Sequence, residues 1–222
     1  LITCTMPPGH AGGLDVVVTV DDQDSGDSGA GLFSYSAPVV RGISPLNSDT
    51  PIKEGFEVTI LGEHFGSPTD TPEIAIDGVS TFAAYILNDG ELRFTAPAAS
   101  GTNLTVEVWI DGRAANFDYP DGLSPRADWV PPVVTAVEGP GTPGGVATIG
   151  GYGFGVAGNR SDIEVFVEDV GPCVDVVVIS DGDMLSCITG PGTGADHAIS
   201  IVVGGQNGSM APGLGGFTFQ RP

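Results

Sequence analysis

The sequence contains few basic residues, and this scarcity limits the partners that it can bind. Lysine and arginine together number 7 against 28 aspartates and glutamates, which gives a formal net charge of −21, and Lys53 is the single lysine. An acidic surface of this kind repels phosphate backbones and anionic membranes. We therefore expect no nucleic-acid partner and no membrane contact within this segment.

Long apolar runs and helical periodicity are absent as well. No apolar run reaches the roughly 18 residues that a membrane-spanning helix needs, and no basic segment followed by an apolar one marks a secretion signal. The chain starts at Leu1 without a methionine, so we expect a piece of a longer or processed protein. Any targeting signal or anchor is then expected outside this segment.

Glycine and proline are abundant where helix-forming patterns are missing. The 35 glycines and 18 prolines separate short runs in which apolar and polar residues alternate. This pattern is typical of short strands joined by tight turns. We expect an all-β fold with almost no helix, and a hairpin turn with positive φ angles at residues 88–90.

The residue groups that carry enzyme chemistry are not found in the sequence. His10, His64 and His197 fall in separate loops without a neighbouring metal-ligand motif. Neither a nucleophile elbow nor a phosphate-binding loop occurs. We therefore expect no enzyme activity, no cofactor and no zinc-type metal site.

One acidic loop is a weak calcium candidate, because hard cations bind oxygen ligands. Its four carboxylates are those of Asp21, Asp22, Asp24 and Asp27. The corresponding loops at residues 204–207 and 111–114 do not repeat these acids, and the spacing of an EF-hand is missing. A solvated loop is the simpler interpretation.

One stretch occurs twice and sets the domain organisation. Residues 56–66 read FEVTILGEHFG and residues 145–155 read GVATIGGYGFG. Gly62, Phe65 and Gly66 thus align with Gly151, Phe154 and Gly155 at one offset (151 − 62 = 89). Each copy begins with the alternation of a half-buried strand and ends in a Gly-rich bend that turns one Phe inward. A repeat of about 90 residues indicates tandem domains.

This pattern of a strand, a Gly-x-x-Phe-Gly turn and further short strands resembles the IPT/TIG family of immunoglobulin-like domains. The resemblance covers most of the chain and implies tandem β-sandwiches of the E-set type. The family occurs in cell-surface receptors, in bacterial and protist surface proteins, beside carbohydrate-active enzymes and in transcription factors, so it specifies function only loosely. The negative charge disfavours the DNA-binding branch.

A second internal match indicates that the chain begins inside a domain. Cys4 aligns with Cys187 at an offset of 183 residues (187 − 4), and the valines at 16, 18 and 20 align with residues 199, 201 and 203. We expect the C-terminal part of a domain at 1–37, complete domains at 38–121 and 132–222, and a linker at 122–131.

The partial domain should carry three or four strands whose apolar face lacks its opening strands. The side chains left uncovered would be those of Val16, Val18, Val20, Phe33 and Tyr35. Burying such side chains is worth roughly 1.5 to 3 kcal/mol each. We expect upstream residues, or strands lent by another copy, to cover them.

The strand pattern also predicts the two cores. In the first complete domain the expected core residues are Val58, Ile60, Phe65, Ile74 and Ile76. In the second they are Ile149, Phe154, Ile163, Val165, Ile199 and Ile201.

The three cysteines are assigned from the family resemblance and the extracellular composition. Cys173 and Cys187 flank a predicted hairpin and are expected to form a disulfide; two buried thiols are the alternative. Cys4 is expected to pair with a residue upstream of this chain. Phe94 stands near the position of Cys187 in the first complete domain, which has no cysteine.

Three tripeptides match the acceptor pattern for N-linked glycans and fall at strand edges or turns. Their asparagines are Asn103, Asn159 and Asn207. We expect covalent glycans on at least one of them if the source organism glycosylates.

Three functions compete. The leading hypothesis is a non-enzymatic structural or adhesive extracellular protein, in which these units build a glycosylated surface stalk, fibre or filament with other copies or neighbouring repeats as partners. The second is a ligand-binding receptor ectodomain, which requires an exposed apolar patch. The third is an accessory module of a polysaccharide-active enzyme, which requires exposed aromatics such as Trp109 or Trp129. We expect these two tryptophans to serve in packing.

Overall fold

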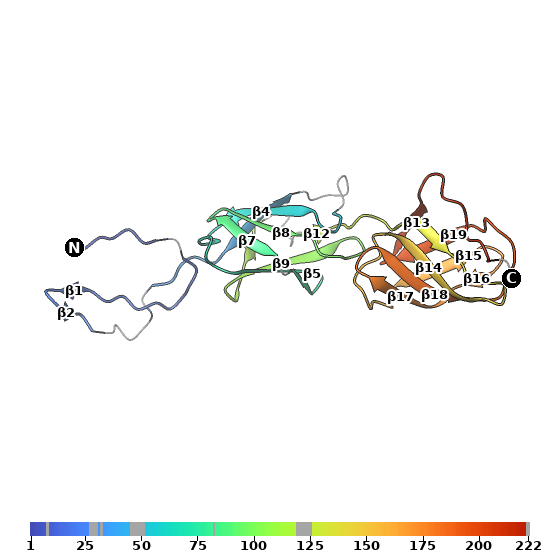
Figure 1. The fold of residues 1–222 in the computed structure, drawn as a ribbon. Helices are drawn as coiled ribbons and strands as arrows, with labels where there is room; N and C mark the ends of the chain where they lie inside the picture. Colours follow the sequence, from blue (N-terminus) through green and yellow to red (C-terminus); the bar gives the residue numbers. More distant parts are fainter. Residues whose placement is uncertain are drawn as a thin grey trace. The chain divides into compact units, whose positions relative to one another are not determined.

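The computed structural model describes residues 1–7, 9–26, 31, 33–44, 52–81, 83–118 and 126–220 (Figure 1). None of these residues lies in a helix, so no membrane-spanning helix is found among them. The all-β prediction is confirmed. Contacts divide the chain into two compact units, which we consider separately: Leu1–Pro45, Glu57–Thr95 and Thr105–Pro125 form the first, and Leu46–Phe56, Ala96–Leu104 and Arg126–Pro222 form the second.

We call residues 38–121 the first repeat, and the strands among its described residues form an immunoglobulin-like sandwich of two sheets. Its strands are β3 (Val39–Ser44), β4 (Glu57–Glu63), β5 (Pro72–Ile76), β6 (Val79–Thr81), β7 (Ala84–Asn88), β8 (Glu91–Thr95), β9 (Leu104–Ile110), β10 (Arg113–Ala114) and β11 (Asn116–Phe117). One sheet has the order β11-β3-β4-β8-β7, and the other contains β10-β9-β5-β6. β11 runs parallel to β3, and the other neighbours in these orders are antiparallel.

Residues 132–222, called the second repeat, have the same topology. Their strands are β13 (Val133–Glu138), β14 (Gly145–Tyr152), β15 (Ile163–Val167), β16 (Gly171–Pro172), β17 (Val174–Ser180), β18 (Met184–Thr189), β19 (Ile199–Val203), β20 (Gln206–Asn207) and β21 (Ser209–Met210). The sheet orders are β17-β18-β14-β13-β21 and β16-β15-β19-β20. The closing parallel strand recurs as β21 beside β13. Alternation in the sequence thus produces the same two sheets twice.

The repeated Gly-x-x-Phe-Gly motif has a packing explanation. Phe65 and Phe154 are fully buried. A Cβ atom added at Gly62 would collide with the Phe65 ring and with the carbonyl of Val39, and Gly151 is in the same position toward the Phe154 ring. The motif therefore needs glycine at this place because the Phe ring folds back over its own strand.

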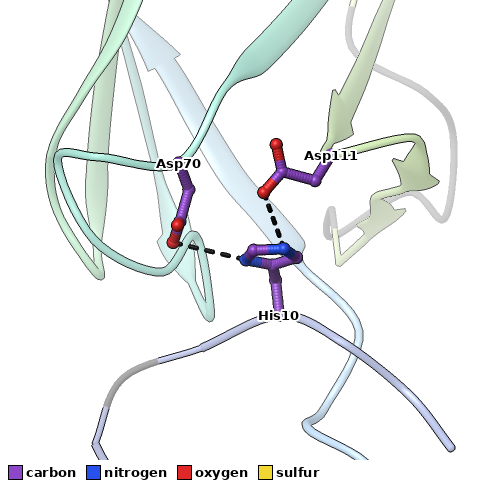
Figure 2. Close-up of side chains that lie close together, drawn as sticks. All are labelled: His10, Asp70 and Asp111. Carbon is purple, nitrogen blue, oxygen red and sulfur yellow. Dashed lines mark ion pairs between the residues drawn. The ribbon is translucent and has the colours of Figure 1, made fainter.

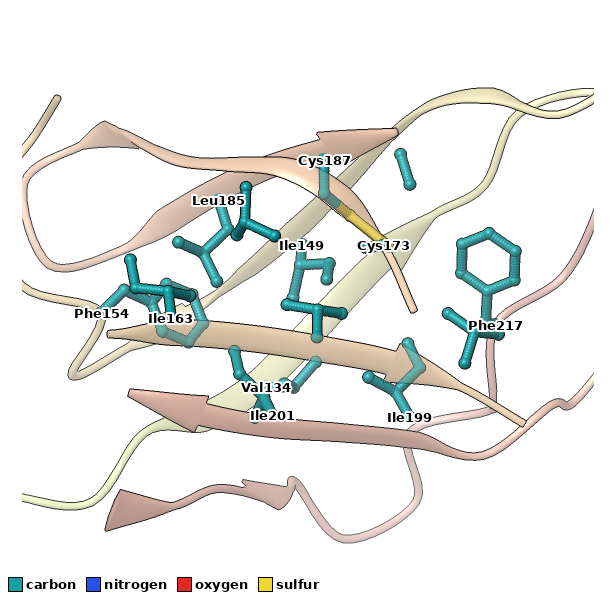
Figure 3. Close-up of a cluster of buried hydrophobic side chains, with 14 of the residues drawn as sticks. Val134, Ile149, Phe154, Ile163, Cys173, Leu185, Cys187, Ile199, Ile201 and Phe217 are labelled. Atoms are coloured by element: carbon teal, nitrogen blue, oxygen red, sulfur yellow. A yellow bond between two sulfur atoms is a disulfide. The ribbon is translucent and has the colours of Figure 1, made fainter. Parts of the chain in front are cut away.

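Both predicted cores are confirmed, because all the residues expected there are buried. The second repeat has one continuous core, which Figure 3 shows between its two sheets. Its largest fully buried side chains include Phe154, Phe217 and Ile149.

Residues 1–37 contain less regular structure than predicted. The described residues of this segment form only the two-residue strands β1 (Thr19–Val20) and β2 (Gln23–Asp24) and a single bridge between Leu14 and Phe33. The expectation of three or four strands is therefore wrong for them. The physical reason is the absence of pairing partners: the strands that align with them in the second repeat, β18 and β19, are held by β14, β17 and β15.

The apolar residues of this segment are only partly covered. Val16, Val18 and Val20 are exposed. Phe33 and Tyr35 are half-buried and stack edge to face, with ring centroids 5.0 Å apart.

The described part of the predicted linker at 122–131 makes several contacts within the second unit. β12 (Arg126–Ala127) is a strand, Trp129 bridges to Ile52, and the Val130 N–H donates to the Ile52 carbonyl. Trp129 is only 1% exposed, and its Nε1 donates to the Pro97 carbonyl at 3.2 Å. A buried tryptophan needs both apolar neighbours for its ring and an acceptor for its N–H. Both are provided at Trp129, and these contacts hold the surrounding residues in place.

The hairpin predicted at residues 88–90 is present between β7 and β8, but its φ angles differ from the prediction. None of its residues has a positive φ. The Asn88 side chain instead accepts a hydrogen bond from the Gly90 N–H at 2.9 Å, as in an Asx turn. Positive φ at two successive positions occurs in the turns Asp77–Gly78 and Asp111–Gly112.

Candidate functional site

A charged cluster forms where the N-terminal segment contacts the first repeat (Figure 2). His10 comes from the N-terminal segment, Asp70 from the loop between β4 and β5, and Asp111 from the turn between β9 and β10. The His10 Nε2 lies 2.6 Å from an Asp111 oxygen, and the Nδ1 lies 3.3 Å from an Asp70 oxygen. Figure 2 shows the imidazole ring between the two carboxylates.

Both carboxylates are held in place by backbone groups. Asp70 accepts a hydrogen bond from the Ser67 N–H at 2.8 Å, and Asp111 accepts one from the Thr71 N–H at 3.1 Å. Burial by itself raises the pKa of Asp70, but the hydrogen bond from Ser67 and the nearby His10 outweigh it, so the pKa lies below its usual value. The ionised form of Asp70, which can pair with a cation, is therefore favoured.

Arg113 completes the contact. Its Nη1 donates to the carbonyl of His10 at 3.1 Å and to that of Tyr35 at 2.8 Å, and Ser36 O lies at 3.4 Å. One guanidinium thus joins two stretches of the N-terminal segment to the β10 strand. We call the set His10, Asp70, Asp111 and Arg113 the ionic junction.

The cluster of His10, Asp70 and Asp111 is also the set of described residues whose ligand atoms converge closely enough for a metal ion. Its geometry does not suit a metal ion. The two carboxylates face different ring nitrogens, whereas a metal ion takes only one nitrogen from an imidazole. Nδ1 stands at ion-pair distance without a well-formed hydrogen bond.

The sequence pattern does not indicate this cluster, because the three histidines fall in separate loops. The carboxylate partners of His10 lie 60 and 101 residues further along the chain (70 − 10 and 111 − 10), so no local spacing points to them. A signal exists in the repeat alignment. Asp70 and Arg113 are charged where the second repeat has Asn159 and Gln206.

A corresponding junction with neutral residues lies in the second unit. Gln206 Oε1 accepts from the Gly101 N–H at 2.9 Å, and Gln206 Nε2 donates to the Trp129 carbonyl at 2.9 Å. Ser100 packs against Gly155, as His10 packs against Gly66. We call Ser100, Gly101, Gln206 and Trp129 the neutral junction. Gln206 binds two backbone groups there, as Arg113 does in the ionic junction.

The two cysteines of the second repeat are joined by a disulfide inside the core (Figure 3). The Cα atoms of Cys173 and Cys187 are 5.7 Å apart, within the usual range for a bridge. Cys4 is exposed and belongs to no disulfide among the described residues. Its pairing with an upstream residue stays a prediction.

The glycan acceptors differ in accessibility. Asn103 and Asn207 are exposed, and Asn103 lies in a turn with φ of 59°. Asn159 is half-buried, and its side-chain oxygen accepts a hydrogen bond from the Ser161 N–H at 2.9 Å. Glycosylation therefore stays a prediction that is best directed at Asn103 and Asn207.

The calcium candidate does not gather its carboxylates in the part that the structure describes. Asp21 and Asp22 adopt positive φ at the β1–β2 turn, and Asp24 hydrogen-bonds to the Thr19 hydroxyl. All three are exposed. Asp27 lies outside the described residues.

The two tryptophans do not form a paired platform. Trp129 is buried, whereas Trp109 is half-buried on the outer face of β9, directly opposite Glu73 of β5. Of the two, only Trp109 offers part of its ring to solvent.

Comparison with known proteins gives one family and several distant structures. The IPT/TIG domain profile matches residues 38–123 and 132–219. No curated protein matches the chain. SGBP-B from a complex xyloglucan utilization locus in Bacteroides uniformis is 18% identical over 78% of this chain and 48% of that one, with a TM-score of 0.32.

Two further solved structures are similarly distant. The surface glycan-binding protein PbSGBP-B from Prevotella bryantii is 11% identical over 79% of this chain and 41% of that one, with a TM-score of 0.41. InvD of Yersinia pseudotuberculosis is 14% identical over 83% and 58%, with a TM-score of 0.29. The chain thus spans only about half the length of these proteins. At these scores the similarity carries no argument about function.

Proposed function

Because the chain belongs to the IPT/TIG domain family, we propose that it is a non-enzymatic structural or adhesive segment of an extracellular surface protein. Its sandwiches serve as repeated units of a glycosylated stalk, fibre or filament, and its partners are neighbouring repeats and other copies. The proposed location is the cell surface or a secreted filament.

The observation that carries this proposal is the use of polar side chains at the two junctions. Arg113, His10 and Gln206 are polar side chains that in an enzyme could face an open site. Here Arg113 donates to backbone carbonyls of the N-terminal segment. Gln206 donates to the Trp129 carbonyl and accepts from the Gly101 N–H, and His10 lies between two carboxylates. Hydrogen bonds to charged groups contribute roughly 1.5 to 3 kcal/mol each, so the contacts of Arg113 favour an N-terminal segment that is held in place within the first unit.

The charge of the chain supports an extracellular structural role over the family's DNA-binding role. With 28 acidic and 7 basic residues, the surface repels nucleic acids and keeps a long repeated protein soluble. The disulfide is consistent with an oxidising compartment.

The test converts the ionic junction into the neutral one. The double variant His10→Ser and Arg113→Gln carries the residues of the neutral junction, and the single variant Arg93→Ser, which changes an outward residue of β8, is the control. If the junction fixes the N-terminal segment, amide protection of Leu14 and Tyr35 drops at least tenfold in the double variant only. Unchanged protection would mean that the segment is not held by these residues, and the proposal would lose its support.

A second function rests on Trp109. Partly exposed aromatic rings beside a carboxylate are suited to stacking on a sugar ring and hydrogen-bonding its hydroxyls, and Trp109 stands opposite Glu73. A glycan-binding accessory role predicts that soluble β-glucans retard the protein in affinity electrophoresis and that Trp109→Ala abolishes the retardation. Absence of retardation with a panel of such glucans leaves the structural role as the better interpretation.

A further inference from the structure

A cavity of about 280 Å³ lies in the second unit, beside the turn between β17 and β18. Residues from the β3–β4 connection, from the Trp129 segment and from the Gly-x-x-Phe-Gly motif of the second repeat complete its walls. Pockets for small molecules usually occupy about 300 Å³ or more, so this one suits a small ligand. We call it the Tyr152 cavity, and its charged and aromatic lining residues are Lys53, Glu54, Trp129, Tyr152, Asp181 and Asp183.

The aromatic wall of the cavity already holds an ammonium group. The Nζ of Lys53, the single lysine of the chain, lies 4.4 Å from the centroid of the Tyr152 ring. A cation within about 6 Å of a ring centroid is attracted by the negative face of the ring. The neighbouring wall is held in place, because Trp129 is 1% exposed and its Nε1 donates to the Pro97 carbonyl. The cavity thus offers a fixed surface on which an alkyl ammonium group is stable.

Three carboxylates make the remaining charged lining negative. The Glu54 carboxylate reaches the β17–β18 turn, where it lies so close to Gly182 that a Cβ atom added there would collide with it. Burial and the charges of Asp181 and Asp183 raise the pKa of Glu54. The opposing charge is that of Lys53, which lowers it. Among the described residues, none of the three carboxylates has a basic group within ion-pair distance. The cavity therefore carries negative charge that its own lysine does not neutralise.

The fold does not impose this set of residues. Both repeats make the same backbone hydrogen bonds, from the first Gly and the Phe of the Gly-x-x-Phe-Gly motif to the tip of the neighbouring hairpin. The first repeat nevertheless has Glu63 where the second has Tyr152, and Gly90 where the second has Asp183. The ring of the cavity and one of its acids are therefore particular to the second repeat.

We propose that the Tyr152 cavity binds a small alkyl diammonium ion. One ammonium group replaces that of Lys53 on the aromatic ring, and the other faces the carboxylates. Lys53 then moves into solvent, which its flexible side chain permits because the residue is exposed. The inference goes beyond the proposed function, because a repeated structural unit needs no small-molecule site.

The lining disfavours the other classes of ligand. An anion would be repelled by the three carboxylates. A metal ion would lack a coordination shell, because among the described residues the ligand atoms of these acids do not converge within metal-binding distance. A neutral sugar could stack on this face of Tyr152 only by displacing Lys53, which would leave the negative charge without its lysine.

Titration of the 222-residue chain with 1,4-diaminobutane, followed by amide chemical shifts, tests the proposal. Moderate salt screens diffuse attraction to the acidic surface. We expect saturable shifts concentrated at Lys53, Gly153 and Gly182. The uncharged 1,4-butanediol, which has the same length, should produce no such shifts.

Two double variants separate the cavity from the rest of the acidic surface. Glu54→Gln with Asp183→Asn should weaken binding at least about fivefold, because two ionic contacts are lost. Glu138→Gln with Glu168→Gln removes the same charge from exposed positions outside the cavity and should leave the affinity unchanged. Equal weakening in both would show diffuse attraction and would overturn the proposal, as would the absence of saturable shifts.

The variant Lys53→Met tests the class of ligand. It removes the resident ammonium group, so binding should become about threefold tighter. Its control, Arg160→Met, removes one positive charge from an exposed position elsewhere in the second repeat and should not change the affinity. Weaker binding to Lys53→Met would mean that the ligand needs the lysine as a partner, and the proposal would then be wrong.

Discussion

The two repeats share one topology but place their charges differently. In the first repeat, Arg113 and two aspartates bind the preceding segment, and Arg93 links two glutamates on the outer sheet face. In the second repeat the equivalent junction positions are neutral, a disulfide crosses the core, and Val146, Met184 and Ser186 stand at the positions of Glu57, Glu91 and Arg93. The comparison separates what the fold requires from what each repeat adds to it. Inward alternation and the Gly-x-x-Phe-Gly motif recur, whereas junction and outer-face residues do not.

The disulfide should produce the largest difference between the repeats. Cys173 and Cys187 close a loop with a sequence separation of 14, so reducing the bond should lower the free energy of unfolding of the second repeat by about 3 kcal/mol. The first repeat, with Phe94 buried near the equivalent place, should be unaffected. Hydrogen exchange resolved by repeat, with and without reductant, measures both. Equal destabilisation of the two repeats by reductant would refute the comparison. Mass spectrometry of a non-reduced digest checks that Cys4 forms no disulfide with Cys173 or Cys187.

The two junctions should differ in strength. Arg113→Ala removes charged hydrogen bonds to two carbonyls and should cost about 2 kcal/mol in local opening at Leu14 and Tyr35. Gln206→Ala removes two neutral hydrogen bonds and should cost about 1 kcal/mol at Gly101. Amide exchange at these residues gives both values. The test is which variant loses more free energy of local opening. A larger loss in Gln206→Ala than in Arg113→Ala would mean that the neutral junction is the stronger one.

Only the ionic junction should respond to pH. The pKa of Asp70 lies below its usual value, so its contribution is present at neutral pH and is lost as the pH falls through that lowered value. Protection of Leu14 and Tyr35 should therefore be high at neutral pH and should fall at acidic pH.

The neutral junction provides the control for this pH profile, because Ser100, Asn159 and Gln206 do not titrate in the same range. Protection of Gly101 should stay flat. Asp70→Asn should remove the loss of protection at the acidic end of the profile. A profile shared by both junctions would contradict the role given to His10 and Asp70.

The smallest effect concerns Glu54 in the second unit. Burial and the nearby Asp181 and Asp183 raise its pKa, whereas Lys53 lowers it. A carboxylate with a raised pKa destabilises the folded state at neutral pH, and this penalty disappears as the pH falls through its folded value. Glu54→Gln should therefore raise stability at neutral pH by less than about 0.5 kcal/mol, because solvent screens an exposed group. Thermal melts at neutral and acidic pH should show the gain only at neutral pH.

The sequence predicts the cores well, because local patterns determine them. Val58 and Ile60 face inward by simple alternation, and Gly62 predicts the inward ring of Phe65. The candidate site could not be predicted in this way. His10, Asp70 and Asp111 come together only once two parts of the chain have docked, and no spacing in the sequence encodes that contact.

Two features that the sequence patterns do not indicate have related physical causes. Residues 126–130 contain proline-flanked polar positions typical of a linker, but burial of the Trp129 ring outweighs that local preference. The strands predicted in the N-terminal segment depend on neighbours, since a strand pattern specifies pairing only when a partner strand is present. In both cases the structure depends on contacts between residues that are far apart in the sequence. Local patterns in a single sequence do not indicate such contacts.

The ring that folds over its own strand has a consequence for how the chain assembles during synthesis. Phe65 reaches the space left by Gly62 only three residues away, and Phe154 does the same at Gly151. A contact of such short sequence separation closes with little loss of chain entropy, so each sandwich has a local starting point that does not wait for distant strands. In a chain of related domains, early closure within each repeat lowers the chance that a strand is exchanged with its neighbour.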